Sequence, residues 1–228
     1  MSLGKRIFAM TYDHQMAKVE RLWLGDLRRG VLAGLSGDVL EIGAGTGANL
    51  DLYPAAVRSV TLTEPEAPML NRLERRLDGA PCPATALRAP AEDLPFEADS
   101  FDAVVSTLVL CGVDDQQRAL REIRRVLRPG GTLAFVEHVR ADDPELAHTQ
   151  DRMNWLNRLV VHCDCNRPTP STMTAAGFEF DAIEHVDAAK VPKFIRPWVA
   201  GTAHVADTVD RSTSPSARRA GDVGASSS

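Results

Sequence analysis

The sequence predicts an α/β fold: a mostly parallel, seven-stranded sheet with one antiparallel strand, covered by helices on both faces in a three-layer sandwich. Apolar, strand-like runs alternate with helical patterns along most of the chain, and such alternation places consecutive strands parallel. The last two strand-like runs leave no room for a helix between them. We therefore expect them to pair as a hairpin and to place an antiparallel strand at the edge of the sheet.

Seven segments are rich in the β-branched and apolar residues typical of strands. They are 39–42, 59–63, 85–88, 101–107, 132–139, 178–185 and 199–207. Helical periodicity fills the other segments. The predicted helices are a first one capped by Asp13, a short one before Pro54, one beginning near Pro65, and 115–127, 145–161 and 172–176.

Composition narrows the function classes. The chain has 228 residues, 44% of them hydrophobic and 25% charged, as expected of one globular domain. A net charge of -5 argues against nucleic acid as a partner, since phosphate binding favours a basic face. The sequence has no apolar run of about 20 residues and no signal peptide, so a cytoplasmic protein without a transmembrane segment is expected. The four cysteines are few and irregularly spaced, which predicts reduced thiols.

A glycine-rich turn follows the first predicted strand. Gly43, Gly45 and Gly47 stand between a strand and a helix, where backbone approaches a ligand closely and takes up positive φ. Glu64 lies twenty-one residues beyond Gly43, at the end of the second strand. A carboxylate there can accept hydrogen bonds from both ribose hydroxyls of an adenosine. Glycines and acid together indicate a nucleoside site.

The glycines alone leave two cofactors open. Gly43, Gly45 and Ala48 also satisfy the dinucleotide pattern, and a single match of that kind is weak. Glu41 stands two residues before the first glycine, where it can accept hydrogen bonds from loop amides or from the α-ammonium of a methionine moiety. A carboxylate at this position would repel a diphosphate, which argues against a nicotinamide cofactor.

The segment from Glu41 to Gly47 resembles motif I of class I S-adenosylmethionine-dependent methyltransferases, and Glu64 resembles their ribose-binding acid. The stretches 91–104 and 127–131 are similar to the methyltransferase type 11 group. This resemblance implies a Rossmann-like fold and S-adenosyl-L-methionine as cofactor. The residues that it places at the cofactor are Glu41, Gly43, Ala44, Gly45, Gly47, Glu64, Ala91, Glu92, Thr107 and Leu108.

A narrower likeness concerns the acceptor. The segments 46–49, 107–111 and 135–139 are similar to the methyltransferase-like thiol S-methyltransferases, whose substrates are small alkyl thiols. The resemblance therefore implies a methyltransferase that acts on a small apolar acceptor, with a thiol among the candidates. The alternatives are a protein that binds S-adenosylmethionine without turnover, because Pro90 replaces an adenine-binding acid of many relatives, and a nicotinamide-dependent oxidoreductase.

We expect three parts in the chain: a helical lid segment over 1–36, a domain over 37–208 that the resemblance identifies as a class I methyltransferase domain, and a disordered tail over 209–228. The tail is rich in Ser, Ala, Gly and Arg without apolar periodicity, so it cannot offset the entropy of ordering.

His138 is the candidate catalytic residue, because it follows the fifth strand at its carboxyl end and imidazole titrates in the range of a base. The other interpretation is a histidine that only hydrogen-bonds the strand end. Glu137 and Tyr12 are weaker candidates.

No metal is expected, since 162–165 holds one Cys/His pair and no second pair exists. Cys163 and Cys165 are expected to be small apolar fillers, and Cys111 to be part of the core. The stretch 191–198 could form a substrate pocket, touch a membrane surface or be a packed connection, the last being favoured.

Overall fold

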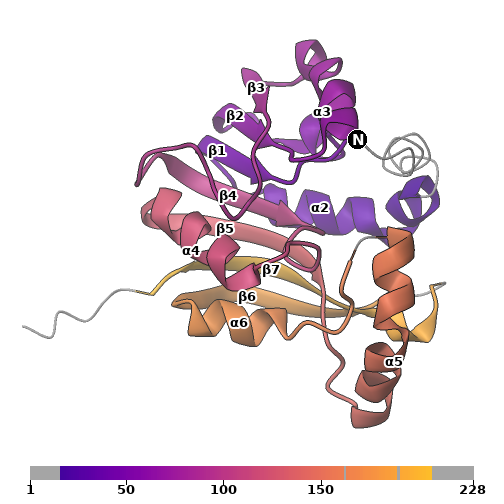
Figure 1. Cartoon of the computed structure of the whole chain (residues 1–228). Coiled ribbons are helices and arrows are strands. Elements are labelled where there is room, and N and C mark those ends of the chain that lie inside the picture. Colours follow the sequence, from indigo (N-terminus) through magenta and orange to yellow (C-terminus); the bar gives the residue numbers. More distant parts are fainter. Residues whose placement is uncertain (1–15, 162, 189–190, 207–228) are drawn as a thin grey trace, which may run out of the picture.

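The computed structural model describes residues 16–161, 163–188 and 191–206, which form a seven-stranded sheet between two layers of helices (Figure 1). The predictions for Tyr12, Asp13, His162 and the tail lie outside these residues. The strand order is β3-β2-β1-β4-β5-β7-β6. The strands are β1 (Gly37–Ile42), β2 (Val57–Thr63), β3 (Ala84–Leu87), β4 (Phe101–Thr107), β5 (Leu127–His138), β6 (Phe178–Asp187) and β7 (Pro197–Val205).

The strand directions confirm the predicted sheet, with one correction. Strands β1 to β5 pair in parallel, and β7 runs antiparallel to both β5 and β6. The prediction that the antiparallel strand forms the edge was wrong: β7 lies inside the sheet and β6 is the edge strand. Burial explains the order, because Trp198, Val199 and Ala203 of β7 are buried, whereas most positions of β6 are exposed.

Each face of the sheet packs against its own helices. Side chains alternate between the faces, so that Val104 and Val105 of β4 belong to different apolar cores. Helices α2 (Gly25–Leu32) and α3 (Ala67–Glu74) cover one face. Helices α4 (Gln116–Val126) and α6 (Thr169–Ala175) cover the other. The three-layer sandwich predicted from the alternation of elements is confirmed.

The helices differ from the prediction in detail. A π-helical turn (Glu20–Leu24) leads into α2, and a 3₁₀ turn (Leu50–Leu52) stands where a short helix was predicted between β1 and β2. Helix α6 begins earlier than predicted, because proline is tolerated in the first helical turn. Helix α5 (Pro144–Val161) contacts the 3₁₀ turn Lys193–Ile195. No helix among the described residues is both long and apolar enough to cross a bilayer.

The parallel strands place the predicted site residues together at the carboxyl ends of the strands. Strands β1, β2, β4 and β5 end at Ile42, Thr63, Thr107 and His138, and parallel strands present their carboxyl ends on the same side of a sheet. The glycine turn, Glu64, the loop after β4 and the imidazole therefore lie along the same edge.

Candidate active site

The glycine turn after β1 leaves space for a ligand. Gly43 and Gly45 have φ of +54° and +58°, a region that other residues rarely adopt. A Cβ on Gly43 would lie 2.7 Å from a methyl group of Val109, whereas a Cβ on Gly45 would meet nothing within 4 Å. The turn is thus packed on one side and open in front of Gly45, as a cradle for a ligand requires.

Glu64 closes this turn against β2. Its Oε2 accepts a hydrogen bond from the Gly45 amide at 2.9 Å, and its Oε1 accepts one from the Glu66 amide at 2.8 Å. Burial raises the pKa of Glu64, and the two backbone donors oppose that shift. The carboxylate therefore lies where a strand-end acid can meet a nucleoside.

Glu41 is buried beneath the turn. Asn49 Nδ2 donates to one carboxylate oxygen at 2.9 Å and the Tyr53 hydroxyl donates to the other at 2.5 Å. The sequence analysis expected loop amides to donate to Glu41, whereas its described hydrogen-bond donors are these two side chains. Burial raises the pKa of Glu41 to about 7, although the two hydrogen bonds and the charge of Arg28 act in the opposite direction. A contact between Glu41 and an ammonium group stays a prediction.

The raised pKa of Glu41 has a measurable effect on stability. The folded chain keeps a proton on this group up to about pH 7, whereas the unfolded chain releases it near the ordinary pKa of 4.5. The contribution of Glu41 to the free energy of unfolding therefore falls as pH rises from about 4.5 to about 7. Above about pH 7 this contribution no longer changes with pH. We expect Glu41→Gln, which cannot titrate, to gain stability relative to the wild type across this window. Urea unfolding of both chains at a series of pH values measures it, and a constant difference would contradict the assignment.

Arg28 is a site residue that the sequence analysis missed. It projects from α2, is 3% exposed, and donates to Thr107 Oγ1 at 2.6 Å, to Asn49 Oδ1 at 3.0 Å and to the carboxylate of Glu20 at 3.1 Å. Its position between the buried Leu24 and Val31 was the available signal, because a cation among buried residues needs partners. Asn49 bonds to both Arg28 and Glu41, so a buried cation and a buried acid lie on either side of one amide, an arrangement that suits the zwitterionic end of an amino acid.

The loop after β4 is held by Glu137. This buried carboxylate accepts hydrogen bonds from the Val109, Leu110 and Cys111 amides at 3.0 to 3.1 Å and from the Ser106 hydroxyl at 2.7 Å. With its oxygens engaged in this way, Glu137 positions the loop. Within the loop, Leu108 has φ of +63°, uncommon outside glycine.

The predicted adenine-side residues lie in the loop after β3. Ala91 is buried, and Glu92 accepts hydrogen bonds from the backbone amides of Asp114 and Asp115 at 2.8 and 3.3 Å. Glu92 thus joins this loop to the segment before α4. Their contact with a cofactor stays a prediction.

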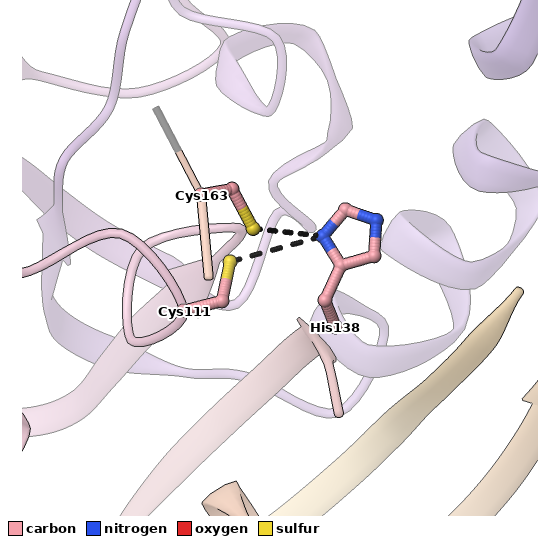
Figure 2. Close-up of side chains that lie close together, drawn as sticks. All are labelled: Cys111, His138 and Cys163. Carbon is pink, nitrogen blue, oxygen red and sulfur yellow. Dashed lines mark hydrogen bonds between the residues drawn. The ribbon is translucent and has the colours of Figure 1, made fainter. Parts of the chain in front are cut away.

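His138 meets two cysteines from distant parts of the chain (Figure 2). Its Nδ1 lies 3.2 Å from Cys163 Sγ and 3.8 Å from Cys111 Sγ. All three residues are buried, with Cys111 fully enclosed and His138 9% exposed. The Trp198 ring packs on the imidazole at 3.9 Å between centroids. In Figure 2 the second ring nitrogen of His138 points away from both sulfur atoms.

The two thiols have opposite tendencies to ionise. A hydrogen bond from Cys111, together with the neighbouring His138, lowers the pKa of Cys163 to about 5 against the effect of burial. The same hydrogen bond, with burial, raises the pKa of Cys111. The hydrogen bond between the two thiols therefore favours ionisation of Cys163 over ionisation of Cys111.

The fold thus gives the cysteines different surroundings from those expected. Cys163 belongs to the His138 cluster rather than being only an apolar filler, and Cys111 is both buried in the core and part of that cluster. Cys165 packs elsewhere, where its backbone amide donates to Asn154 at 3.0 Å. No motif in the sequence indicated this cluster, because its members lie in three separate segments.

The described part of the stretch around Trp198 is a packed connection, as favoured from the sequence. Trp198 is 3% exposed, Phe194 and Ile195 are partly buried, and the Trp198 indole donates to the Ile195 carbonyl at 2.8 Å.

Comparison with known proteins identifies the family of this chain. Residues 40–135 match the family described as a methyltransferase domain. Thiol S-methyltransferase TMT1A of Homo sapiens is 34% identical over 208 residues, which cover 86% of this chain and 82% of that protein. Thiol S-methyltransferase TMT1B of Homo sapiens is 45% identical over 117 residues, 47% of this chain and 46% of that protein.

Solved structures share the fold at low identity. The S-adenosylmethionine-dependent methyltransferase of Mesorhizobium loti aligns with a TM-score of 0.58 at 20% identity, covering 82% of this chain and 97% of that one. The [4+2]-cyclase SpnF aligns with a TM-score of 0.66 at 21% identity, covering 80% of each. Since a cyclase shares this architecture, the fold by itself does not define the reaction. The match to the methyltransferase family does: this chain belongs to the S-adenosylmethionine-dependent methyltransferases, enzymes with a Rossmann-like fold, and its cofactor is S-adenosylmethionine.

Proposed function

We propose that this methyltransferase acts on the sulfur atom of a small, apolar thiol. The likeness to TMT1A carries the proposal, because that thiol S-methyltransferase aligns with 86% of this chain. The quinone C-methyltransferase UbiE of Hahella chejuensis, 36% identical, aligns with 58% of the chain and 55% of its own length. A thiol is therefore favoured over a quinol.

We place the cofactor at the carboxyl ends of the parallel strands, where the site residues lie. When bound, S-adenosylmethionine supplies an electrophilic methyl group on a sulfonium. Glu64 accepts hydrogen bonds from the ribose hydroxyls, while Glu41 and Arg28 take the ammonium and carboxylate of the amino-acid end. The remaining proposed contacts are Gly43, Ala44, Gly45 and Gly47 in the turn, Ala91 and Glu92 at the adenine, and Thr107 and Leu108 at the methionine.

The acceptor side must align a sulfur atom with the methyl group and favour its thiolate, because the thiolate is the nucleophile. His138 is the residue that we propose for this second task. It stands at the end of β5, and its ring lies against Trp198 and two sulfur atoms. The apolar side chains of Leu108 and Val109, in the loop after β4, suit an alkyl substituent.

The net charge and the state of the cysteines support two further parts of the proposal, the class of substrate and the cellular compartment. A net charge of -5 disfavours nucleic acid as a substrate. The four cysteines are free thiols, and three of them are buried. Free thiols persist in a reducing compartment, so we place the activity in the cytoplasm. In this proposal, the predicted domain over residues 37–208 carries the catalytic activity.

A matched acceptor series tests the proposal. We expect an alkyl thiol to accept radiolabelled methyl from S-adenosylmethionine roughly 100-fold faster than the alcohol of equal chain length, because only the thiol ionises readily near neutral pH. Methyl incorporation is counted in the extracted product for the thiol, the alcohol, the amine and a quinol. Turnover of the quinol or amine, with none of the thiol, would contradict a sulfur acceptor.

A further inference from the structure

We infer that Cys111, His138 and Cys163 bind one Zn²⁺ ion and that the acceptor thiol occupies its fourth position. The inference rests on the proposed function and specifies how His138 favours the thiolate: as a metal ligand. Two cysteines and one histidine form a ligand set found in catalytic zinc sites, which leave one position open.

The ligand atoms have the spacing that a tetrahedral zinc ion requires. With Zn–S near 2.3 Å and Zn–N near 2.0 Å, two ligands of a tetrahedron lie about 3.5 Å apart. The imidazole Nδ1 lies 3.2 Å from one sulfur and 3.8 Å from the other, and all three atoms fall within 4.8 Å of one another. The two nitrogen–sulfur distances need shifts of only a few tenths of an ångström to reach this value.

The surrounding groups hold the three ligands in place. Glu137 fixes the Cys111 amide, and the Asn157 side chain donates to the Cys163 carbonyl at 2.6 Å. Trp198 packs against the imidazole. Within the described parts of the chain, the metal-competent group of Cys, His, Asp and Glu at this place has only these three members. The described residues therefore supply three ligands, and we assign the fourth position to the acceptor thiol.

The cluster also adjoins the cofactor turn. The loop after β4 runs from Leu108 to Cys111, and Val109 within it lies against Gly43. One short loop thus contacts the glycine turn and supplies a ligand to the cluster. A thiol that binds the metal loses its proton to solvent, since a coordinated thiol is deprotonated. The sulfur of the bound thiol then lies at the carboxyl ends of the strands, where the acceptor must meet the cofactor.

Metal titration of the reduced full-length chain tests the site. After treatment with a chelator, Zn²⁺ is titrated in competition with a chromogenic chelator, and Co²⁺ serves as an optical probe for thiolate ligands. We expect one metal ion per chain, with binding weakened roughly 100-fold by Cys163→Ser and by Cys111→Ser. Cys165→Ser is the matched control, because Cys165 lies two residues away outside the cluster, and it should bind as the wild type does. Circular dichroism verifies that each variant is folded.

The results separate this inference from the proposed function. Addition of an alkyl thiol should change the Co²⁺ spectrum of the wild type, and the alcohol of equal length should not. Absence of stoichiometric metal, or binding unchanged in folded Cys163→Ser, would overturn the site. Thiol methylation at full rate by metal-free protein would also overturn the inference and leave the proposed function standing. Metal binding without methylation of any thiol would refute the proposed acceptor, and with it the fourth-position role.

Discussion

Replacing Glu64 with alanine is expected to weaken binding of S-adenosylmethionine by roughly 100-fold or more, because each hydrogen bond to a charged group contributes about 1.5 to 3 kcal/mol. The proposed carboxylate contacts with the ribose would be lost. The Gly45 amide, which now donates to Glu64 at 2.9 Å, would also lose its partner, so the glycine turn would be less well ordered before binding.

Isothermal titration calorimetry with S-adenosylmethionine and S-adenosylhomocysteine measures this effect. Glu64→Gln should fall between the wild type and the alanine variant, since an amide oxygen can still accept from Gly45 but carries no charge. Glu74→Ala, which removes an exposed carboxylate at the end of α3, should leave the affinity unchanged. Wild-type affinity in Glu64→Ala would disprove the proposed ribose contact.

Substitution of two glycines by alanine should separate folding from cofactor binding. In both Gly43→Ala and Gly45→Ala the positive φ costs about 1 to 2 kcal/mol of stability. In Gly43→Ala the new methyl group also meets Val109, so we expect the larger fall in melting temperature. In Gly45→Ala the methyl group projects into open space, the proposed cofactor position, so we expect the larger loss of affinity, roughly 100-fold or more.

Thermal unfolding without ligand and calorimetry on the folded proteins measure the two effects independently. Gly34→Ala provides a control, because its Cβ also meets nothing within 4 Å and its φ is not positive. The placement of the cofactor would be wrong if Gly45→Ala bound S-adenosylmethionine as tightly as Gly34→Ala does.

The part of the fold that was predictable is the part set by short-range pattern. Apolar runs, turn glycines and the separation between Gly43 and Glu64 are read along the chain, and the structure confirms the parallel sheet that they predict. The position of β7 was not predictable in this way. Whether the last strand lies inside or at the edge depends on what covers each face, a property of the assembled sheet.

The same limit applies to the site. The cofactor edge contains a recognisable motif, whereas Arg28 reaches it from a helix that precedes the motif. The grouping of Cys111, His138 and Cys163 depends on two loops and the end of β5, which meet only after folding. Long-range proximity of this kind leaves no periodic mark on the sequence. The cysteines accordingly looked like ordinary core residues.

The engagement of three consecutive amides by Glu137 restricts how this enzyme can change its substrate. Because the acid on β5 and the backbone from Val109 to Cys111 are bonded together, displacement of either would leave buried amide groups without acceptors. The main chain on the proposed acceptor side is therefore held in place. We expect new acceptors to be gained by exchanging side chains on this frame, such as Leu108 and Val109, and a change of loop length here to destabilise the fold.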